Sequence, residues 1–204
     1  MESTIYLIRH GETDWNSERR FQGQTDIPLN KKGKLQANLL AQRIFNEGVR
    51  FSALYSSDLA RAKETAEIIA SYHNLQVGLI NGLRERFFGN LQGVTIDEIK
   101  RDYPDVDLTD LGQYEFFNLE PLQIFKARIY DSISEISQKH LNDHIAIVSH
   151  GAAINSFLHQ ISDGQLGTGI TQINNTSITK VIIDHQVNRW SVKELNDASH
   201  LEVI

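Results

Sequence analysis

Two short apolar runs in this chain end in the same way, with a histidine followed by a glycine. Ile5 to Ile8 leads into Arg9-His10-Gly11, and Ile145 to Val148 leads into Ser149-His150-Gly151. Apolar runs of this length predict buried strands. In a parallel sheet the carboxyl ends of the strands meet at one edge, and ligands bind in the crevice beyond it. The pattern therefore predicts a sheet that brings His10, His150 and Arg9 together.

Strands and helices alternate along the rest of the chain. Further strands are expected at 51–55, 76–80, 177–184 and 189–195, and helices at 30–48, after 57, at 94–103, at 119–141 and after 151. This alternation indicates an α/β fold, a three-layer α/β/α sandwich with a mostly parallel central sheet. The late pair of strands predicts an antiparallel edge strand. The apolar face of the first helix is expected to carry Leu35, Leu39, Ala41 and Phe45.

Composition narrows the classes of function. The formal net charge of -6 argues against a nucleic-acid or anionic-membrane partner, although a local cluster of cations could still hold a small anion. Cysteine is absent, which excludes disulfides, zinc–thiolate sites and thiol nucleophiles. No metal-ligand cluster is evident, and neither a metal nor another cofactor is expected.

The chain of 204 residues has no linker-like or low-complexity run, so a single domain, 1–204, is expected. No apolar run approaches the roughly 18 residues of a membrane span. The first residues lack the basic start and apolar stretch of a signal peptide. A cytoplasmic location is therefore expected, and the oligomeric state is left open.

Arg61 adds a third strand exit. It follows the strand at 51–55 within the first turn of a helix, where a cation opposes the helix dipole unless an anion shares that end. Alone, Arg61 is more simply a solvated helix residue, and its coincidence with Arg9, His10 and His150 is what favours a site. Two arginines and two histidines suit a doubly charged oxyanion, above all phosphate. Cationic neighbours disfavour protonation of an imidazole, so a neutral, nucleophilic His10 is expected.

The remaining histidines carry no such pattern. Each is more simply interpreted as a structural residue than as a catalytic one: His73, His140, His144, His159, His185 and His200.

Four motifs together resemble the signature of the histidine phosphatase superfamily, the phosphoglycerate mutase-like proteins that include many phosphatases. The first is 7–13 with Asn16, and the second is 56–62 with Thr65-Ala66. The third is 83–85 with Phe88-Gly89 and Gly93, and the fourth is 148–151. All four occur in family order, so the resemblance covers nearly the whole chain. The segment 103–119 carries no matching motif.

The resemblance implies a role for each matched residue. His10 would be the nucleophile that becomes a phosphohistidine. Arg9, Arg61 and His150 would bind the phosphoryl group and stabilise the charge of its transition state. These roles agree with the physical demands of phosphoryl transfer, which needs positioning and spread positive charge more than elaborate covalent chemistry.

Further residues follow from the same resemblance. Asn16 lies where the family adds a phosphate contact, and Gln22 with Gly23 lies where many members carry a small hydroxyl residue before glycine. Glu85 matches the acid/base that protonates the leaving alcohol and later takes a proton from water. The residues alone do not separate Glu85 from Glu12, because Glu85 could equally be a surface residue paired with a neighbouring arginine.

The implied activity is that of a metal-independent, histidine acid-type phosphatase that hydrolyses small phosphomonoesters with broad specificity. Two alternatives remain, a cofactor-dependent phosphoglycerate mutase and a non-catalytic phospho-ligand binding protein. The phosphatase is favoured because the chain ends soon after its last strand and because the third motif resembles the phosphatase branch.

The leaving-group side is less determined. Five aromatic residues could form an apolar wall for the leaving group, although each is more simply interpreted as a core or lid residue: Phe21, Phe87, Tyr114, Phe116 and Phe117. The segment 103–119 is expected to form part of a cap over the site, because it is irregular and rich in aromatic residues.

Overall fold

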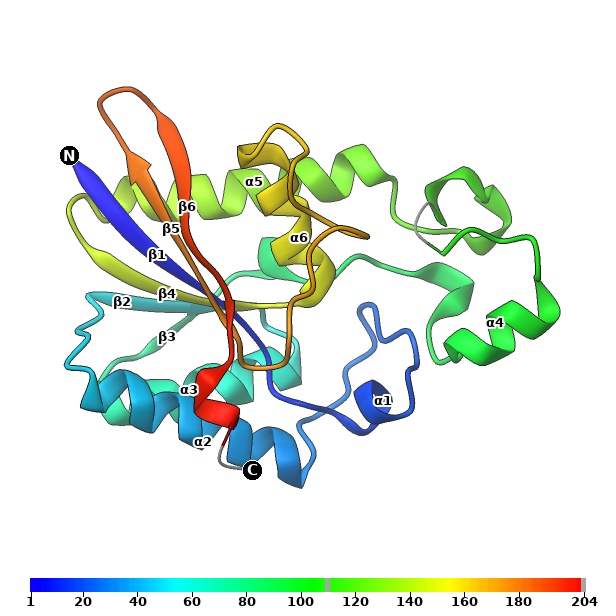
Figure 1. Ribbon diagram of the computed structural model, residues 1–204, viewed down its shortest axis with the longest axis horizontal. Coiled ribbons are helices and arrows are strands. Elements are labelled where there is room, and N and C mark those ends of the chain that lie inside the picture. Colours follow the sequence, from blue (N-terminus) through cyan, green and yellow to red (C-terminus); the bar gives the residue numbers. More distant parts are fainter. Residues whose placement is uncertain (109–110, 203–204) are drawn as a thin grey trace.

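The computed structural model describes residues 1–108 and 111–202. Its centre is a six-stranded sheet in the order β3-β2-β4-β1-β5-β6 (Figure 1). The strands are β1 (Glu2–Arg9), β2 (Ala53–Ser56), β3 (Val77–Leu79), β4 (His144–Ser149), β5 (Ile178–Asp184) and β6 (Arg189–Asp197). Strands β1 to β4 run parallel, whereas β5 is antiparallel to β1 and β6 is antiparallel to β5. The mostly parallel sheet with an antiparallel edge pair is therefore confirmed.

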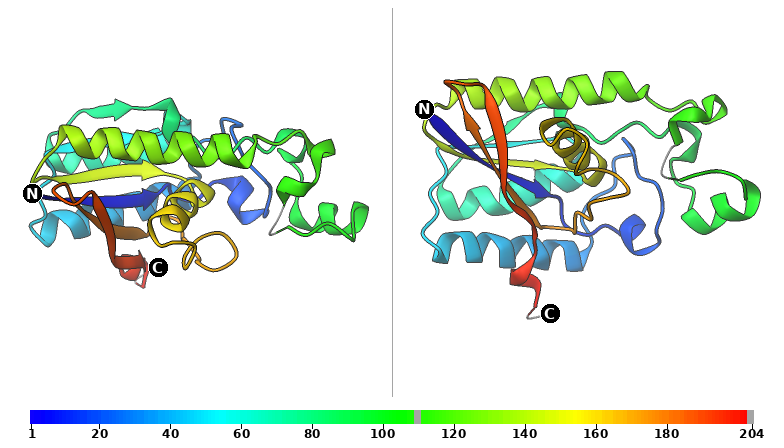
Figure 2. Two further views of the ribbon diagram at one scale, coloured as in Figure 1. Left: turned by 90° about the horizontal axis from the view of Figure 1, so that it is seen from above. Right: turned by 45° about the horizontal axis from the view of Figure 1, so that its top comes forward.

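Helices cover both faces of this sheet (Figure 2). Helices α2 (Lys31–Asn46) and α3 (Ala60–His73) pack on one face, and α5 (Leu122–Lys139) and α6 (Gly151–Ile161) pack on the other. Strand β1 shows why: Ile5 and Leu7 join the core under α5 and α6, while Tyr6 and Ile8 join the core under α2 and α3. A strand buried on both faces needs an unbroken apolar run. The three-layer α/β/α sandwich is confirmed.

Three parallel strands end level with one another. Arg9, the last residue of β1, pairs with Ser149, the last residue of β4. Ser56, the last residue of β2, pairs with Val148. The residues that follow each strand consequently leave the sheet at the same edge, and this register positions the candidate site. Two short helices, α1 (Asp14–Ser17) and α4 (Ile96–Asp102), lie beyond that edge (Figure 1).

The predicted apolar face of α2 is partly wrong. Ala41 is buried as expected, but Leu35 and Phe45 are 47% and 45% exposed. The helix instead buries Gly33, Gln36, Ala37, Leu40, Ala41 and Ile44. Gln36 turns inward because its side-chain oxygen accepts the backbone N–H of Glu12 at 2.9 Å. A polar contact to the turn after β1 thus sets the orientation of a helix whose apolar residues leave it ambiguous.

A third, smaller apolar cluster lies beyond the carboxyl edge of the sheet. It contains Leu91, Ile99, Leu111 and Phe117, and Phe21 packs against it. Phe21 is also bound through its backbone, donating to the carbonyl of Val94 at 3.0 Å and accepting from the N–H of Gly93 at 2.8 Å. The loop around Phe21 and the segment 87–119 therefore pack against each other.

The predicted cap segment 103–119 includes residues 109–110, which lie outside the described residues. Its other residues include two short 3-10 turns, Leu111–Gln113 and Glu115–Phe117. Within the described ranges, no helix combines the length and the hydropathy needed to cross a membrane.

Candidate active site

The three strand exits meet in a cavity of about 260 Å³. The imidazole rings of His10 and His150 lie 5.1 Å apart between centroids. Arg61, in the first turn of α3, places its Nε 3.3 Å from Nε2 of His10. The cavity is lined by most of the residues that the sequence singles out: Arg9, His10, Asn16, Gln22, Gly23, Arg61, Glu85 and Gly151. Segments far apart in the chain thus supply one site.

The hydrogen bonds of His10 define its tautomer. Nδ1 lies 2.7 Å from the carbonyl oxygen of Gly11, which can only accept, so Nδ1 carries the proton. Nε2 accepts from the guanidinium of Arg61 at 3.3 Å and therefore carries a lone pair. The His10 side chain is almost fully buried, at 3% exposure. A neutral imidazole with its lone pair directed to a cationic cavity is the form that a nucleophile requires.

Burial and charge hold both histidines neutral. Burial first, then Arg61 and Arg9, keep the pKa of His10 well below its ordinary value. The same order of causes, with His10 itself added, keeps the pKa of His150 well below its ordinary value. Burial also lowers the pKa of Arg61 to about 10, which leaves the guanidinium protonated at neutral pH. The site therefore pairs neutral imidazoles with fixed cations.

His150 has hydrogen-bonding capacity without a partner. It is fully buried at the N-cap of α6, and neither ring nitrogen has a hydrogen-bond partner among the described residues. An unpaired buried polar group costs about 1–3 kcal/mol. An oxyanion bound in the adjoining cationic cavity would accept a hydrogen bond from His150 and so remove part of this cost.

Both arginines are anchored by main-chain carbonyls. Arg61 donates from Nη2 to Gly23 at 2.7 Å and from Nη1 to Thr25 at 2.9 Å. Arg9 donates from Nη1 to the carbonyl of Ile173 at 2.6 Å, while its Nε is buried without a partner among the described residues. Neutral carbonyls fix the guanidinium planes, and within the described ranges neither guanidinium has a carboxylate within 4.0 Å, so both charges are available to a ligand in the cavity.

Two amide side chains complete the cavity wall. The oxygen of Asn16 accepts from the backbone N–H of Thr13 at 3.1 Å in a capping box at α1, which leaves its NH₂ group available to a ligand. Gln22 is buried, and its Oε1 has no partner within the part of the chain that the structure describes. Asn175, which the sequence patterns do not reveal, donates to the carbonyl of His10 at 2.9 Å and contacts Asn16 at 3.4 Å.

The two candidate acids are separated by their surroundings. Glu85 lines the cavity, and its two oxygens accept the backbone N–H groups of Arg86 at 2.9 Å and Ala152 at 3.0 Å. Glu12 instead pairs with Lys32 at 2.9 Å and accepts from Asn30 at 3.1 Å. Only Glu85 is thus placed to exchange a proton inside the cavity.

Arg128 of α5 holds the segment that carries Glu85. Its guanidinium donates to the carbonyls of Gly82 at 3.0 Å, Arg84 at 2.6 Å and Glu85 at 2.8 Å. It also forms a bidentate pair with the carboxylate of Glu120, at 2.6 and 2.8 Å. No sequence motif marks Arg128, because its partners are backbone carbonyls that lie more than forty positions earlier in the chain.

Packing against α2 requires a glycine directly after His10. A Cβ at Gly11 would lie 2.5 Å from the carbonyl oxygen of Gly33 in α2. Conversely, a Cβ at Gly33 would lie 2.0 Å from the carbonyl oxygen of Glu12. The two glycines allow the turn after β1 to sit directly on the first turn of α2.

Of the five aromatic residues that could form a wall, only Phe21 lines the cavity, and packing accounts for Tyr114 and Phe117. Phe21 lines the cavity, but Phe88 rather than Phe87 accompanies it. The other predicted residues, Tyr114, Phe116 and Phe117, stack on one another within the third apolar cluster and its surroundings. The segment has no regular period from which the direction of each ring could be read.

Comparison with known proteins decides the family. A model of the histidine phosphatase superfamily (branch 1) matches residues 5–198. The chain belongs to this superfamily. The uncharacterized phosphatase PhoE of Bacillus subtilis is 33% identical over 199 residues, which cover 98% of this chain and 97% of the relative.

Further members of the superfamily carry different activities in their names. Phosphoglycerate mutase-like protein 4 of Arabidopsis thaliana is 35% identical over 210 residues, which cover 97% of this chain and 86% of the relative. Among solved structures, a phosphoserine phosphatase mutant from Entamoeba histolytica in complex with phosphoserine aligns with a TM-score of 0.83 at 30% identity. The alignment covers 98% of this chain and 99% of that one.

Proposed function

We propose that this protein is a phosphatase that hydrolyses small phosphomonoesters through a phosphohistidine on His10. The observation that carries the proposal is the tautomer of His10, whose unprotonated Nε2 faces a cavity with two anchored arginines. Membership of a superfamily with phosphatase relatives supports the same activity. Within residues 1–108 and 111–202, no group of three or more acidic or histidine side chains could hold a metal ion.

The first half of the reaction transfers the phosphoryl group to the protein. Nε2 of His10 attacks phosphorus, and the bond from phosphorus to the ester oxygen breaks. Glu85, acting in its acid form, gives its proton to the departing alkoxide. The Nδ1–H of His10 keeps its bond to Gly11, which fixes the ring and disperses the charge of the phosphorylated imidazole.

The second half returns the site to its starting state. Glu85 takes a proton from a water molecule, whose oxygen attacks phosphorus as the bond to Nε2 breaks. Arg9, Arg61 and His150 hold the phosphoryl oxygens in both halves, so the protein supplies the positive charge that a metal ion would otherwise provide. Activity should therefore persist in excess chelator.

The superfamily relatives named as mutases keep one competing activity open, in which the phosphoryl group returns to a second oxygen of the substrate. A substrate panel that includes 3-phosphoglycerate, phosphoserine and an aryl phosphate separates the two activities when phosphate release and isomerisation are both measured. We expect phosphate release on several esters and negligible isomerisation. Isomerisation faster than phosphate release would overturn the phosphatase assignment. Broad specificity and a cytoplasmic location stay predictions.

A further inference from the structure

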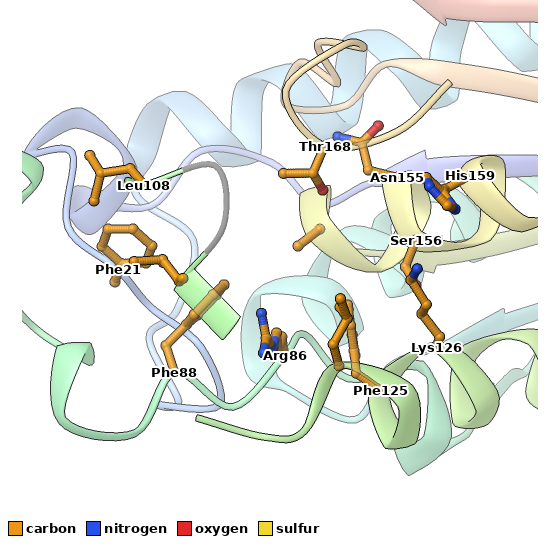
Figure 3. A pocket seen from close by; sticks show the side chains of 13 residues that line it. Phe21, Arg86, Phe88, Leu108, Phe125, Lys126, Asn155, Ser156, His159 and Thr168 are labelled. Atoms are coloured by element: carbon orange, nitrogen blue, oxygen red, sulfur yellow. The ribbon is translucent and has the colours of Figure 1, made fainter. Parts of the chain in front are cut away.

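A second cavity, of about 270 Å³, adjoins the catalytic one. The two cavities share the lining residues Phe21, Phe88, Ala152 and Asn155, so a single ligand can occupy both. The second cavity, here called the slot, lies between α5 and α6, and Phe88 and Leu108 line its other end (Figure 3). Because Ala152 also binds Glu85 through its N–H, the slot begins where the leaving group departs.

The slot carries positive charge without acidic residues. Lys126 lines it, and no aspartate or glutamate is among its described lining residues. No carboxylate lies within 4.0 Å of the Lys126 ammonium in the described ranges, whereas Lys32, Lys34 and Lys180 each pair with a glutamate.

Ser156 provides a second and independent sign of a ligand. Its side chain lines the slot at 6% exposure, and its Oγ has no hydrogen-bond partner among the described residues. Figure 3 shows the amino end of Lys126 pointing towards Ser156. A buried hydroxyl without a partner is destabilising. A ligand oxygen between Lys126 and Ser156 would remove that destabilisation and neutralise the lysine together.

The opposite side of the slot is apolar. Phe21, Phe88 and Leu108 line it at one end, and Phe125 lines its floor (Figure 3). Burial of apolar surface contributes about 25 cal/mol per Å². A bound group therefore gains from an apolar body on this side and from an anionic oxygen on the side of Lys126.

We propose that the slot selects phosphomonoesters whose alcohol part bears a second anionic group, held by Lys126 and Ser156, on an apolar body that contacts Phe21 and Phe88. This specificity rests on the proposed phosphatase activity. The second anionic group is a carboxylate or a second phosphate, since both present charged oxygens to an ammonium and a hydroxyl. Esters with a cationic alcohol part are disfavoured by Lys126.

A matched pair of substrates tests the proposal. 4-Carboxyphenyl phosphate and its neutral amide, 4-carbamoylphenyl phosphate, share size and ring but differ in charge. A charge-assisted hydrogen bond is worth about 1.5–3 kcal/mol, so the wild-type kcat/KM should favour the carboxylate by about 10- to 100-fold. Lys126→Gln should bring this ratio close to one, Ser156→Ala should lower it, and Lys126→Arg should retain most of it.

Lys139→Gln is the control, because Lys139 lies exposed in the last turn of the same helix and should leave the ratio unchanged. 1,4-Phenylene bisphosphate tests a phosphate as the second anionic group. A higher kcat/KM for this ester than for 4-carboxyphenyl phosphate identifies the preferred group as a phosphate, and a lower value identifies it as a carboxylate. Equal rates on the carboxylate and the amide, or a ratio that Lys126→Gln does not change, would overturn the proposal. No phosphate release from any of the esters would instead contradict the phosphatase assignment.

Discussion

Removal of Arg128 should weaken the placement of Glu85 without touching the phosphate-binding groups. Arg128→Ala deletes donors to three main-chain carbonyls and leaves the Glu120 carboxylate without its bidentate partner. Arg128 is 21% exposed and Glu120 12%, so water can replace part of what is lost. We expect a destabilisation of about 2–4 kcal/mol, which corresponds to a fall in Tm of about 4–16 °C for a chain of this size.

The effect on catalysis should depend on the leaving group. A positioned general acid contributes about 10²- to 10⁴-fold, and a shifted Glu85 should forfeit part of that. We expect kcat for an alkyl phosphate to fall by about 10- to 100-fold, because an alkoxide needs its proton, and kcat for 4-nitrophenyl phosphate by about threefold or less. Kinetics on both esters at a temperature well below the Tm of the variant provide the measurement.

Arg84→Ala is the matched control. Arg84 lies in the same segment, but its side chain pairs with Asp58 at 2.7 and 2.6 Å and is 37% exposed. Exposed pairs of this kind are worth about 0–1 kcal/mol, so this variant should lose little stability and show no dependence on the leaving group. Equal losses on both esters in Arg128→Ala, or losses matched by Arg84→Ala, would refute the positioning role.

Two further outcomes concern stability. Gly11→Ala should lower the free energy of unfolding by about 1–3 kcal/mol or more through overpacking, because its Cβ would meet the backbone of α2 at 2.5 Å. The control Gly151→Ala, whose Cβ meets Arg9 at 3.6 Å, should unfold near the wild-type urea concentration. Equal urea midpoints for the two variants would contradict this reasoning. Folding lowers the pKa of His10 and His150, so below about pH 6.5 the unfolded chain takes up protons that the folded chain does not. The contribution of the two histidines to the free energy of unfolding should therefore be fully present above that pH. Below it, the free energy of unfolding should fall by up to about 1.4 kcal/mol per pH unit for each histidine. His10→Asn should make the fall shallower, and an unchanged slope in urea titrations at several pH values would argue against a buried neutral His10.

The part of the site that depends on local pattern and topology could be predicted from the sequence. His10, Arg61 and His150 each follow a strand, and a parallel sheet aligns the ends of its strands, so their convergence follows from three short patterns. Contacts that cross between elements without a pattern could not be predicted. Arg128 and Asn175 bind backbone carbonyls. Every residue type has a backbone carbonyl, so the sequence does not indicate which residue is the acceptor.

The same distinction explains the errors in the fold. The buried face of α5 follows a clear apolar period and was predictable at Phe125, Ile129, Ile133 and Ile136. Helix α2 offers apolar residues on several sides, and the polar contact of Gln36 decides which side turns inward. The segment around Phe87 and Phe88 has no regular hydrophobic period, so sequence alone could not determine which of the two rings faces the site.

The most direct test of the central claim is to trap the phosphoenzyme. Brief exposure to a ³²P-labelled phosphomonoester, followed by rapid denaturation, should give a protein-bound label that is stable to base and labile to acid. Glu85→Gln should retain phosphate binding and slow turnover, and His10→Ala should carry no label and lose activity. Label on a residue other than His10, or full phosphatase activity in His10→Ala, would contradict the account.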